Sequence, residues 1–287
     1  MSQRDAILAR LHEVEALPVA AMKAISLLQN PASDLSEIAR LIGHDPALAA
    51  GVLRLANSAM FGGRSRIETI DAAIARLGTR ATLNLVLGSA VGPMEARPVR
   101  GYDLPAGALW RHNVAVAIGT QALADILKIN APDYAFTAGL LVDIGKQVLG
   151  QFLEIDGAAI AAEAFGRHVS FEQAELRVLG IDHAEIGAAL LTNWGLPESI
   201  VQVVRWHHEP TRCPAEFRTV AELVHASDQI CTLAGIGGGL DGSNYQPCAA
   251  ALDHLNLTTA TIERAMMRIA DGLAQVNDLF EHADAKG

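Results

Sequence analysis

Six side chains between residues 112 and 228 are of the types that bind transition metals. Imidazole nitrogens and carboxylate oxygens are ligands suited to Fe, Mn, Zn or Ni, and a helical bundle can bring such groups together from separate helices. Their spacing along the chain demonstrates nothing by itself, so these residues are only candidates for a divalent metal site. They are His112, Asp143, His183, His207, His208 and Asp228.

An ordinary structural role is the alternative for the same histidines. His207 and His208 stand at the end of a helical segment, in WHHEP, where a histidine interacts favourably with the helix dipole. An isolated histidine in a protein core is usually a hydrogen-bonded packing residue. The residue pattern alone leaves both interpretations open.

Helical periodicity dominates the segments that must position these side chains. In IARLIGHDPALAAGVLRLAN the apolar residues recur three and four positions apart, and Asp45 followed by Pro46 predicts an N-cap with proline in the first turn. Asp34 and Glu37 form a pattern similar to a capping box before another helix. Strand-like alternation is not convincing anywhere in the sequence. The sequence therefore predicts an all-α fold.

Two segments interrupt the helical pattern. Residues 92–107, GPMEARPVRGYDLPAG, contain three prolines and three glycines. This composition predicts a boundary between an N-terminal helical domain, residues 1–104, and a C-terminal helical domain, residues 105–287. Residues 235–247, GIGGGLDGSNYQP, are rich in glycine but lack the Gly-Lys-Ser/Thr ending of a phosphate-binding loop. A plain mobile loop is the expectation there.

The composition argues against several classes of protein. The chain of 287 residues has a formal net charge of −10, which does not suit a surface devoted to nucleic acid. Cys213, Cys231 and Cys248 are far apart and form no C-x-x-C pair, so neither a disulfide framework nor a zinc ribbon is expected. The N-terminal segment lacks the pattern of a signal peptide, and no apolar run reaches the roughly 18 residues of a membrane span. We therefore expect a cytoplasmic protein without a membrane partner.

One segment is compatible with a helix-turn-helix. LSEIARLIGHDPALAAGVLRLANS has Gly43 at the turn, but the helix after Asp45 offers only Arg54 as a basic side chain. A helix that reads the major groove needs polar side chains, so burial in a core is favoured and no nucleic acid partner is expected. In NSAMFGGRSRIETI, Arg64 and Arg66 suggest either a loop that binds an acidic partner or a solvated loop.

An ordered series of segments resembles the HDOD family, the HD-related output domain. The resemblance covers roughly residues 10–275 and implies an N-terminal helical subdomain packed on a C-terminal subdomain similar to the HD phosphohydrolases and the HD-GYP cyclic di-GMP phosphodiesterases. It also implies a role in bacterial signalling, without an established catalytic activity. The segments are LPVAAMKAISLL, DPALAAGVLRLANSAMFG, AIARLG, LLVDIGK, DHAEIGAALLTNWGLPESI and WHHEP.

The resemblance places the candidate ligands in an HD pattern. His112, Asp143 and Asp228 correspond to its first histidine, its HD aspartate and its closing aspartate, and Lys146 corresponds to the lysine of HDxGK. His183, His207 and His208 correspond to the additional histidines that hold a second ion in the HD-GYP enzymes. Asp143, Lys146 and His208 are in addition expected to line a vestigial pocket.

Val142 is the main departure from that pattern. It stands where the HD doublet has a metal-binding histidine, and no GYP motif follows. Valine has no lone pair, and since the loss of an outer-shell partner alone typically lowers metal affinity by about 10–100-fold, the loss of a ligand should cost at least as much. Hydrolysis through a metal-activated water is therefore not expected. The other groups could hold a metal in a shifted arrangement or bond to one another as a buried polar network.

The leading hypothesis is a non-catalytic bacterial signal-transduction module that acts through a signalling protein partner or a ligand. The alternative is a metal-dependent phosphohydrolase or cyclic-nucleotide phosphodiesterase with an altered HD site. The sequence requires no cofactor, and a divalent ion (Fe, Mn, Zn or Ni) is the candidate ligand for the His and Asp groups.

Overall fold

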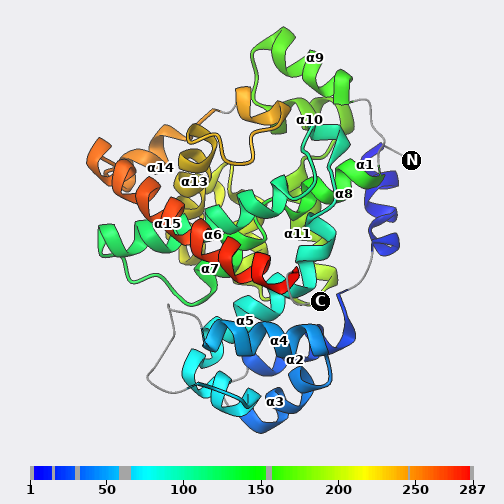
Figure 1. Ribbon diagram of the computed structural model, residues 1–287. Coiled ribbons are helices and arrows are strands. Elements are labelled where there is room, and N and C mark those ends of the chain that lie inside the picture. Colours follow the sequence, from blue (N-terminus) through cyan, green and yellow to red (C-terminus); the bar gives the residue numbers. More distant parts are fainter. Residues whose placement is uncertain are drawn as a thin grey trace. The chain divides into compact units, whose positions relative to one another are not determined.

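The computed structural model describes residues 3–14, 17–29, 33–57, 66–152, 157–244 and 246–284. Fifteen α-helices and four short 3-10 helices are found in these residues, which contain no β-strand beyond a single bridge between Val99 and Leu104. The predicted all-α fold is confirmed (Figure 1). Within the described ranges, no helix is both long enough and apolar enough to cross a bilayer.

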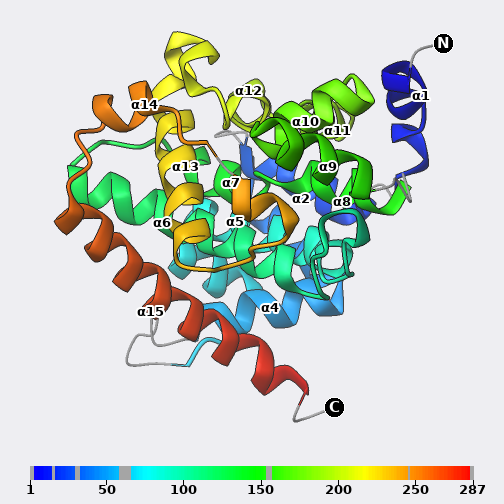
Figure 2. The same cartoon turned by 90° about the horizontal axis from the view of Figure 1, so that it is seen from above.

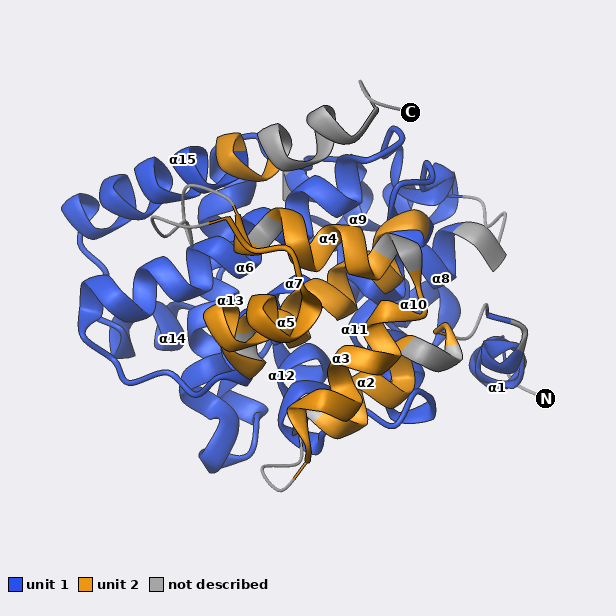
Figure 3. Ribbon diagram, turned by 60° about the horizontal axis from the view of Figure 1, so that its bottom comes forward, with its two compact units in different colours: residues 1–15, 94–273 blue, residues 16–93, 274–287 orange. Residues whose placement is uncertain are grey.

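The chain forms two compact units, each built from two separate stretches of sequence (Figure 3). The boundary between them in the first half of the chain falls at Pro93 and Met94. Residues 94–104, expected in the N-terminal domain, belong to the larger compact unit. A compact unit is defined by contacts and is not the same as a domain, so the expected division between residues 104 and 105 stays a prediction. The larger unit comprises Met1–Glu15 and Met94–Leu273, and the smaller comprises Ala16–Pro93 and Ala274–Gly287.

Local caps define the helices of the smaller unit. Asp34 accepts a hydrogen bond from the backbone N–H of Ser36 at the start of α3, and Asp45 accepts one from that of Leu48 at the start of α4. Both are the caps that the sequence predicts, and each satisfies a backbone donor that has no partner within the helix. The helices of this unit are α2 (Val19–Gln29), α3 (Leu35–Gly43), α4 (Pro46–Ala56) and α5 (Ile70–Glu95), whose last two residues belong to the larger unit.

The helix-turn-helix alternative gains no support from the burial of α4. Leu48, Val52 and Ala56 line one side of this helix and are 4% exposed or less, whereas Arg54 is exposed. The apolar face of α4 thus lies in the core of the smaller unit, as its composition favours. Arg64 lies outside the described residues, and its possible role in a binding loop stays a prediction.

The larger unit is organised around α6, which packs on α7 and α13, while α11 packs on α8 and α12 (Figures 1 and 2). Its three cysteines form no disulfide, as expected. Its helices are α1 (Gln3–Ala9), α6 (Ala108–Leu127), α7 (Tyr134–Leu140), α8 (Ile144–Phe152), α9 (Gly157–Arg167), α10 (Phe171–Leu179), α11 (His183–Asn193), α12 (Glu198–Trp206), α13 (Ala215–Leu233), α14 (Ala249–His254) and α15 (Thr259–Asp284), which ends in the smaller unit. The 3-10 helices are η1 (Leu11–Glu13), η2 (Arg100–Tyr102), η3 (Pro210–Arg212) and η4 (Leu240–Asn244).

A close approach of two backbones brings α8 against α11. A Cβ atom added to Gly145 would overlap the backbone oxygen of His183 and would lie 2.8 Å from the backbone nitrogen of Gly187. Only glycine fits at position 145, since backbone atoms cannot move aside as a flexible side chain can. Gly145 stands between Asp143 and Lys146, so this contact holds both of them close to His183.

We expect Gly145→Ala to lower the free energy of unfolding by roughly 3 kcal/mol or more, because the added methyl group overlaps fixed backbone atoms. Urea denaturation followed by circular dichroism measures the change. Gly166→Ala on α9 is the matched control: a Cβ there meets nothing within 4 Å, so this variant should unfold at the wild-type urea concentration or slightly above it. Equal stability of the two variants would contradict the proposed contact.

Candidate metal centre

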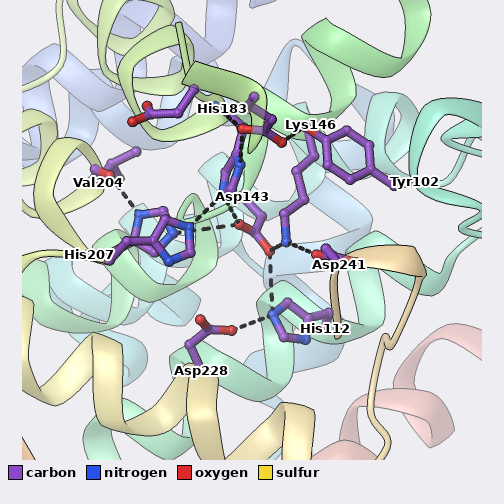
Figure 4. Close-up of polar contacts among 12 residues, drawn as sticks. Tyr102, His112, Asp143, Lys146, His183, Val204, His207, Asp228 and Asp241 are labelled. Atoms are coloured by element: carbon purple, nitrogen blue, oxygen red, sulfur yellow. Dashed lines mark hydrogen bonds and ion pairs between the residues drawn. The ribbon is translucent and has the colours of Figure 1, made fainter. Parts of the chain in front are cut away.

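The six candidate ligands converge in the larger unit (Figure 4). All except His208 are 4% exposed or less, and His208 is partly buried. Helices that are far apart in the sequence supply them. His112 lies on α6, Asp143 in the turn before α8, His183 at the first position of α11, His207 and His208 directly after α12, and Asp228 on α13.

Asp143 lies between two groups of ligands. Its Oδ2 atom is 2.7 Å from Nζ of Lys146 and 3.4 Å from Nε2 of His112, while its Oδ1 atom is 3.5 Å from Nε2 of His183 and 3.8 Å from Nε2 of His207. In each group the ligand atoms lie within 4.8 Å of one another, close enough to share an ion. We call His112, Asp143 and Asp228 the acidic cluster, and His183, His207 and His208 the trihistidine cluster.

In the acidic cluster, both ring nitrogens of His112 face acceptors. Nε2 lies 2.9 Å from Oδ1 of Asp228, and Nδ1 lies 2.9 Å from the backbone oxygen of Ile236. Neither oxygen can donate, so we assign a proton to both nitrogens. Burial opposes the charged ring, but the hydrogen bond and the charge of Asp228 outweigh it and raise the pKa of His112. The two acceptors and the raised pKa both favour the protonated ring.

Lys146 balances the negative charge next to His112. Its ammonium group donates to Oδ2 of Asp143 at 2.7 Å and to Oδ2 of Asp241 at 2.6 Å, and the side chain is almost completely buried. Burial disfavours the ammonium form, but the two carboxylates outweigh it and raise the pKa of Lys146 well above its usual value. The lysine therefore stays charged inside the protein.

The glycine-dense segment forms part of this site, although a plain loop was the expectation. Asp241 lies on η4 within it, and the backbone oxygen of Ile236 faces His112. Gly237 has a φ of 73°, and a Cβ atom there would overlap Cβ of His112. Glycine thus permits both the left-handed backbone and the close approach to the ring.

In the trihistidine cluster, fixed acceptors decide which ring nitrogen carries the proton. Nδ1 of His183 is 2.8 Å from Oε2 of Glu175, and Nδ1 of His207 is 2.7 Å from the backbone oxygen of Val204. Both Nδ1 atoms must donate, which leaves Nε2 of a neutral ring with a lone pair. Nε2 of His207 is buried and has no hydrogen-bond partner among the described residues. It is an unsatisfied acceptor beside Asp143.

A single proton joins the other two rings of the trihistidine cluster. Nε2 of His183 and Nε2 of His208 are 2.7 Å apart, a distance that requires one N–H donor and one acceptor. Burial opposes a charge on His183, but Glu175 outweighs it and raises the pKa to about 9. Burial lowers the pKa of His207 to about 4 and that of His208 well below its usual value. His183 is therefore the donor, and the other two rings are neutral.

Sequence reasoning missed two acids that complete the site, Asp241 and Glu175. Glu175 accepts from both the backbone and the ring of His183 and from the hydroxyl group of Tyr102. It occupies a buried position of α10, between Ala174 and Leu179, where helical periodicity predicts an apolar residue. An acid on an apolar helix face was therefore the available signal. Asp241 offered no such signal, because its segment has no periodicity.

Val142 is fully buried in the turn between α7 and α8. It immediately precedes Asp143, at the position where the resemblance expects a ligand histidine. A valine side chain offers no donor atom to an ion there.

A second buried carboxyl group lies next to the acidic cluster. Glu95 is fully buried, and its Oε1 accepts a hydrogen bond of 2.8 Å from Nδ2 of Asn113, the residue after His112. Burial raises the pKa of Glu95 to about 8, with a partial offset from Asn113. The unfolded chain loses this proton near pH 4.5, so the folded protein holds an extra proton between about pH 4.5 and 8.

We expect the stability that Glu95 contributes to fall as the pH rises through this window. Glu95→Gln keeps an acceptor and places N–H where the acid has O–H. Its free energy of unfolding should match the wild type near pH 5 and exceed it by roughly 2 kcal/mol or more at pH 8, because each pKa unit corresponds to about 1.4 kcal/mol. Urea denaturation at both pH values measures the difference. The exposed Glu263, changed to Gln, is the control, and a Glu95→Gln effect that is independent of pH would contradict the assignment.

Known proteins resemble the chain in sequence and in fold. A relative from Treponema pallidum (strain Nichols), an uncharacterized protein, is 30% identical over 228 residues, which cover 75% of this chain and 41% of the relative's length. The structure of an HDOD domain protein of unknown function from Geobacter sulfurreducens shares 23% identity and a TM-score of 0.70, covering 96% of this chain and 99% of that one. A "Putative phosphohydrolase" from Shewanella amazonensis SB2B shares 29% identity and a TM-score of 0.66, covering 93% and 98%.

The sequence itself matches the HDOD domain over residues 14–210. This range includes five of the six candidate ligands, all except Asp228, and it confirms the resemblance that the ordered segments indicate. The chain belongs to the HDOD domain family.

Proposed function

We propose that the protein is a non-catalytic signal-transduction module, whose HD-type site binds a ligand instead of hydrolysing a phosphoester. Val142 carries this proposal. It is a fully buried aliphatic side chain at the position of a ligand histidine, directly before Asp143. A hydrolytic metal centre needs an ion in a fixed geometry with an open position for water, and a missing ligand removes that geometry.

The hydrogen bonds of the acidic cluster also support the proposal. The ring of His112 donates to Asp228, and Oδ2 of Asp143 accepts from Lys146. An ion at this place would have to displace a proton from His112 and compete with the ammonium group of Lys146. Both changes oppose the binding of the ion that would activate water.

The burial of the site points the same way. Asp143 is 2% and Asp228 3% exposed, and Asp241 pairs with the ammonium group of Lys146. A phosphoester would therefore have to compete with Asp241 for the ammonium group of Lys146. Membership of the HDOD family supports a signalling role, and we include a cytoplasmic location and a signalling protein partner in the same proposal.

The alternative is a metal-dependent phosphohydrolase with an altered site. It is favoured by the two groups of potential ligands within 4.8 Å, and by the relative from Shewanella amazonensis described as a "Putative phosphohydrolase". The two functions differ in one measurable property, which is metal-dependent turnover.

We expect no turnover of cyclic di-GMP or of p-nitrophenyl phosphate above that of Asp143→Asn, with Mn²⁺, Fe²⁺, Mg²⁺ or Ni²⁺ supplied. The reason is the missing ligand at Val142. If the wild type has no hydrolytic activity, Asp143→Asn has none to remove, and both proteins give the same background rate. Product release by chromatography and by absorbance provides the readout. Metal-dependent turnover by the wild type that disappears in Asp143→Asn would establish the enzyme alternative instead.

A further inference from the structure

The two oxygens of Asp143 face different partners. Oδ2 accepts a hydrogen bond from the ammonium group of Lys146 and lies 3.4 Å from Nε2 of His112. Oδ1 faces the nitrogen atoms of His183 and His207 at 3.5 and 3.8 Å, beyond hydrogen-bond distance. Oδ2 is thus held by a direct hydrogen bond, whereas Oδ1 faces imidazole nitrogens without one.

The potential ligand atoms of the trihistidine cluster lie within 4.8 Å of one another. Nδ1 of His183 is held by Glu175, and Nδ1 of His207 is held by the backbone oxygen of Val204, so an ion would meet Nε2 of each ring (Figure 4). At His183 the ion would replace the proton that Nε2 shares with His208. Nε2 of His207 is fully buried without a hydrogen-bond partner in the described part of the chain. An unpartnered buried acceptor is destabilising, and an ion bound to it would remove that cost.

We propose that the trihistidine cluster, with Oδ1 of Asp143 as the fourth ligand, binds one transition-metal ion of the zinc type, and that the ammonium group of Lys146 takes the place of an ion in the acidic cluster. This inference rests on the proposed function, because it names the ligand of the same site. The titration of Zn²⁺ tests the ion site, and the assay of turnover tests the non-catalytic function. Either proposal can therefore be contradicted without the other.

Three separations among the proposed ligand atoms are close to those around such an ion. Zinc–nitrogen bonds of about 2.0–2.1 Å place neighbouring ligand atoms of a tetrahedron about 3.3 Å apart. The corresponding separations here are 2.7 Å between His183 and His208, and 3.5 and 3.8 Å from Asp143 to His183 and His207. Each differs from the tetrahedral value by less than 1 Å. Three imidazoles favour zinc, nickel or cobalt over magnesium and calcium, which prefer oxygen ligands.

The supporting residues have the form expected around a metal-bound histidine. A ring that binds an ion through Nε2 almost always donates its Nδ1 proton to a carboxylate or a backbone oxygen. Glu175 and the carbonyl group of Val204 play these parts, and Glu175 is itself fixed by the hydroxyl group of Tyr102 at 2.5 Å. Both rings are therefore oriented before an ion arrives.

The ammonium group of Lys146 opposes the binding of a second ion in the acidic cluster. Its Nζ atom lies 2.7 Å from Oδ2 of Asp143 and 2.6 Å from Asp241, so the charge of both carboxylates is already balanced. A divalent ion that used Oδ2 would stand within a few ångströms of the ammonium charge in a poorly solvated place, where like charges repel strongly. The acidic cluster is therefore closed to a second ion while Lys146 is charged.

The test is a titration of the full chain, freed of metal by dialysis against a chelator, with Zn²⁺ in competition with a chromophoric chelator. The wild type should bind one equivalent. His207→Gln should weaken binding at least tenfold, whereas Asp228→Asn, an equally buried position in the acidic cluster, should leave the affinity within about threefold. Lys146→Met should bind a second equivalent, because it removes the competing charge.

Circular dichroism shows which variants are folded, and Co²⁺ provides an independent readout on the wild type alone. Bound Co²⁺ should give the intense visible absorption of a four-coordinate ion. The proposal is overturned if the wild type binds no Zn²⁺ or two equivalents, or if Asp228→Asn abolishes binding that His207→Gln retains. A single equivalent bound by Lys146→Met would overturn the role given to the lysine.

Discussion

The buried ion pair between Asp143 and Lys146 is the interaction on which the geometry of the site depends. Two charges removed from water are tolerated only when each is well paired, and here the ammonium group contacts Asp143 and Asp241 together. Because Oδ2 of Asp143 is fixed by this contact, Oδ1 must face the trihistidine cluster. Removing either partner of such a pair typically costs about 3–5 kcal/mol, since a buried charge is left alone.

Two close backbone contacts in the larger unit bring the partners of this ion pair together. Gly145 lets α8 approach α11 so closely that Asp143 and Lys146, on either side of it, lie beside His183. The glycines of residues 235–244 let the chain cross His112 and deliver Asp241. Close backbone contacts at these two places thus position charged side chains, in a region where a looser packing would admit water and weaken every electrostatic interaction.

The parts of this structure that depend on neighbours in sequence could be predicted, and those that depend on distant partners could not. The caps at Asp34 and Asp45 follow from a few adjacent residues, and so do the periodic helices. Convergence of the candidate ligands was expected only through resemblance to a family, because no spacing along the chain encodes it. Asp241 escaped notice since its partner, Lys146, lies 95 residues away, and the division of roles between the two oxygens of Asp143 is a purely spatial property.

In the function that we propose, the site keeps its imidazoles, has valine at position 142, and holds an ion without using it to activate water. The most direct measurement is anomalous diffraction at the zinc edge from crystals of the protein grown with Zn²⁺. The account predicts one peak, bounded by His183, His207, His208 and Oδ1 of Asp143, with Lys146 still paired to Oδ2. A peak between His112 and Asp228, with Lys146 displaced from Asp143, would contradict it.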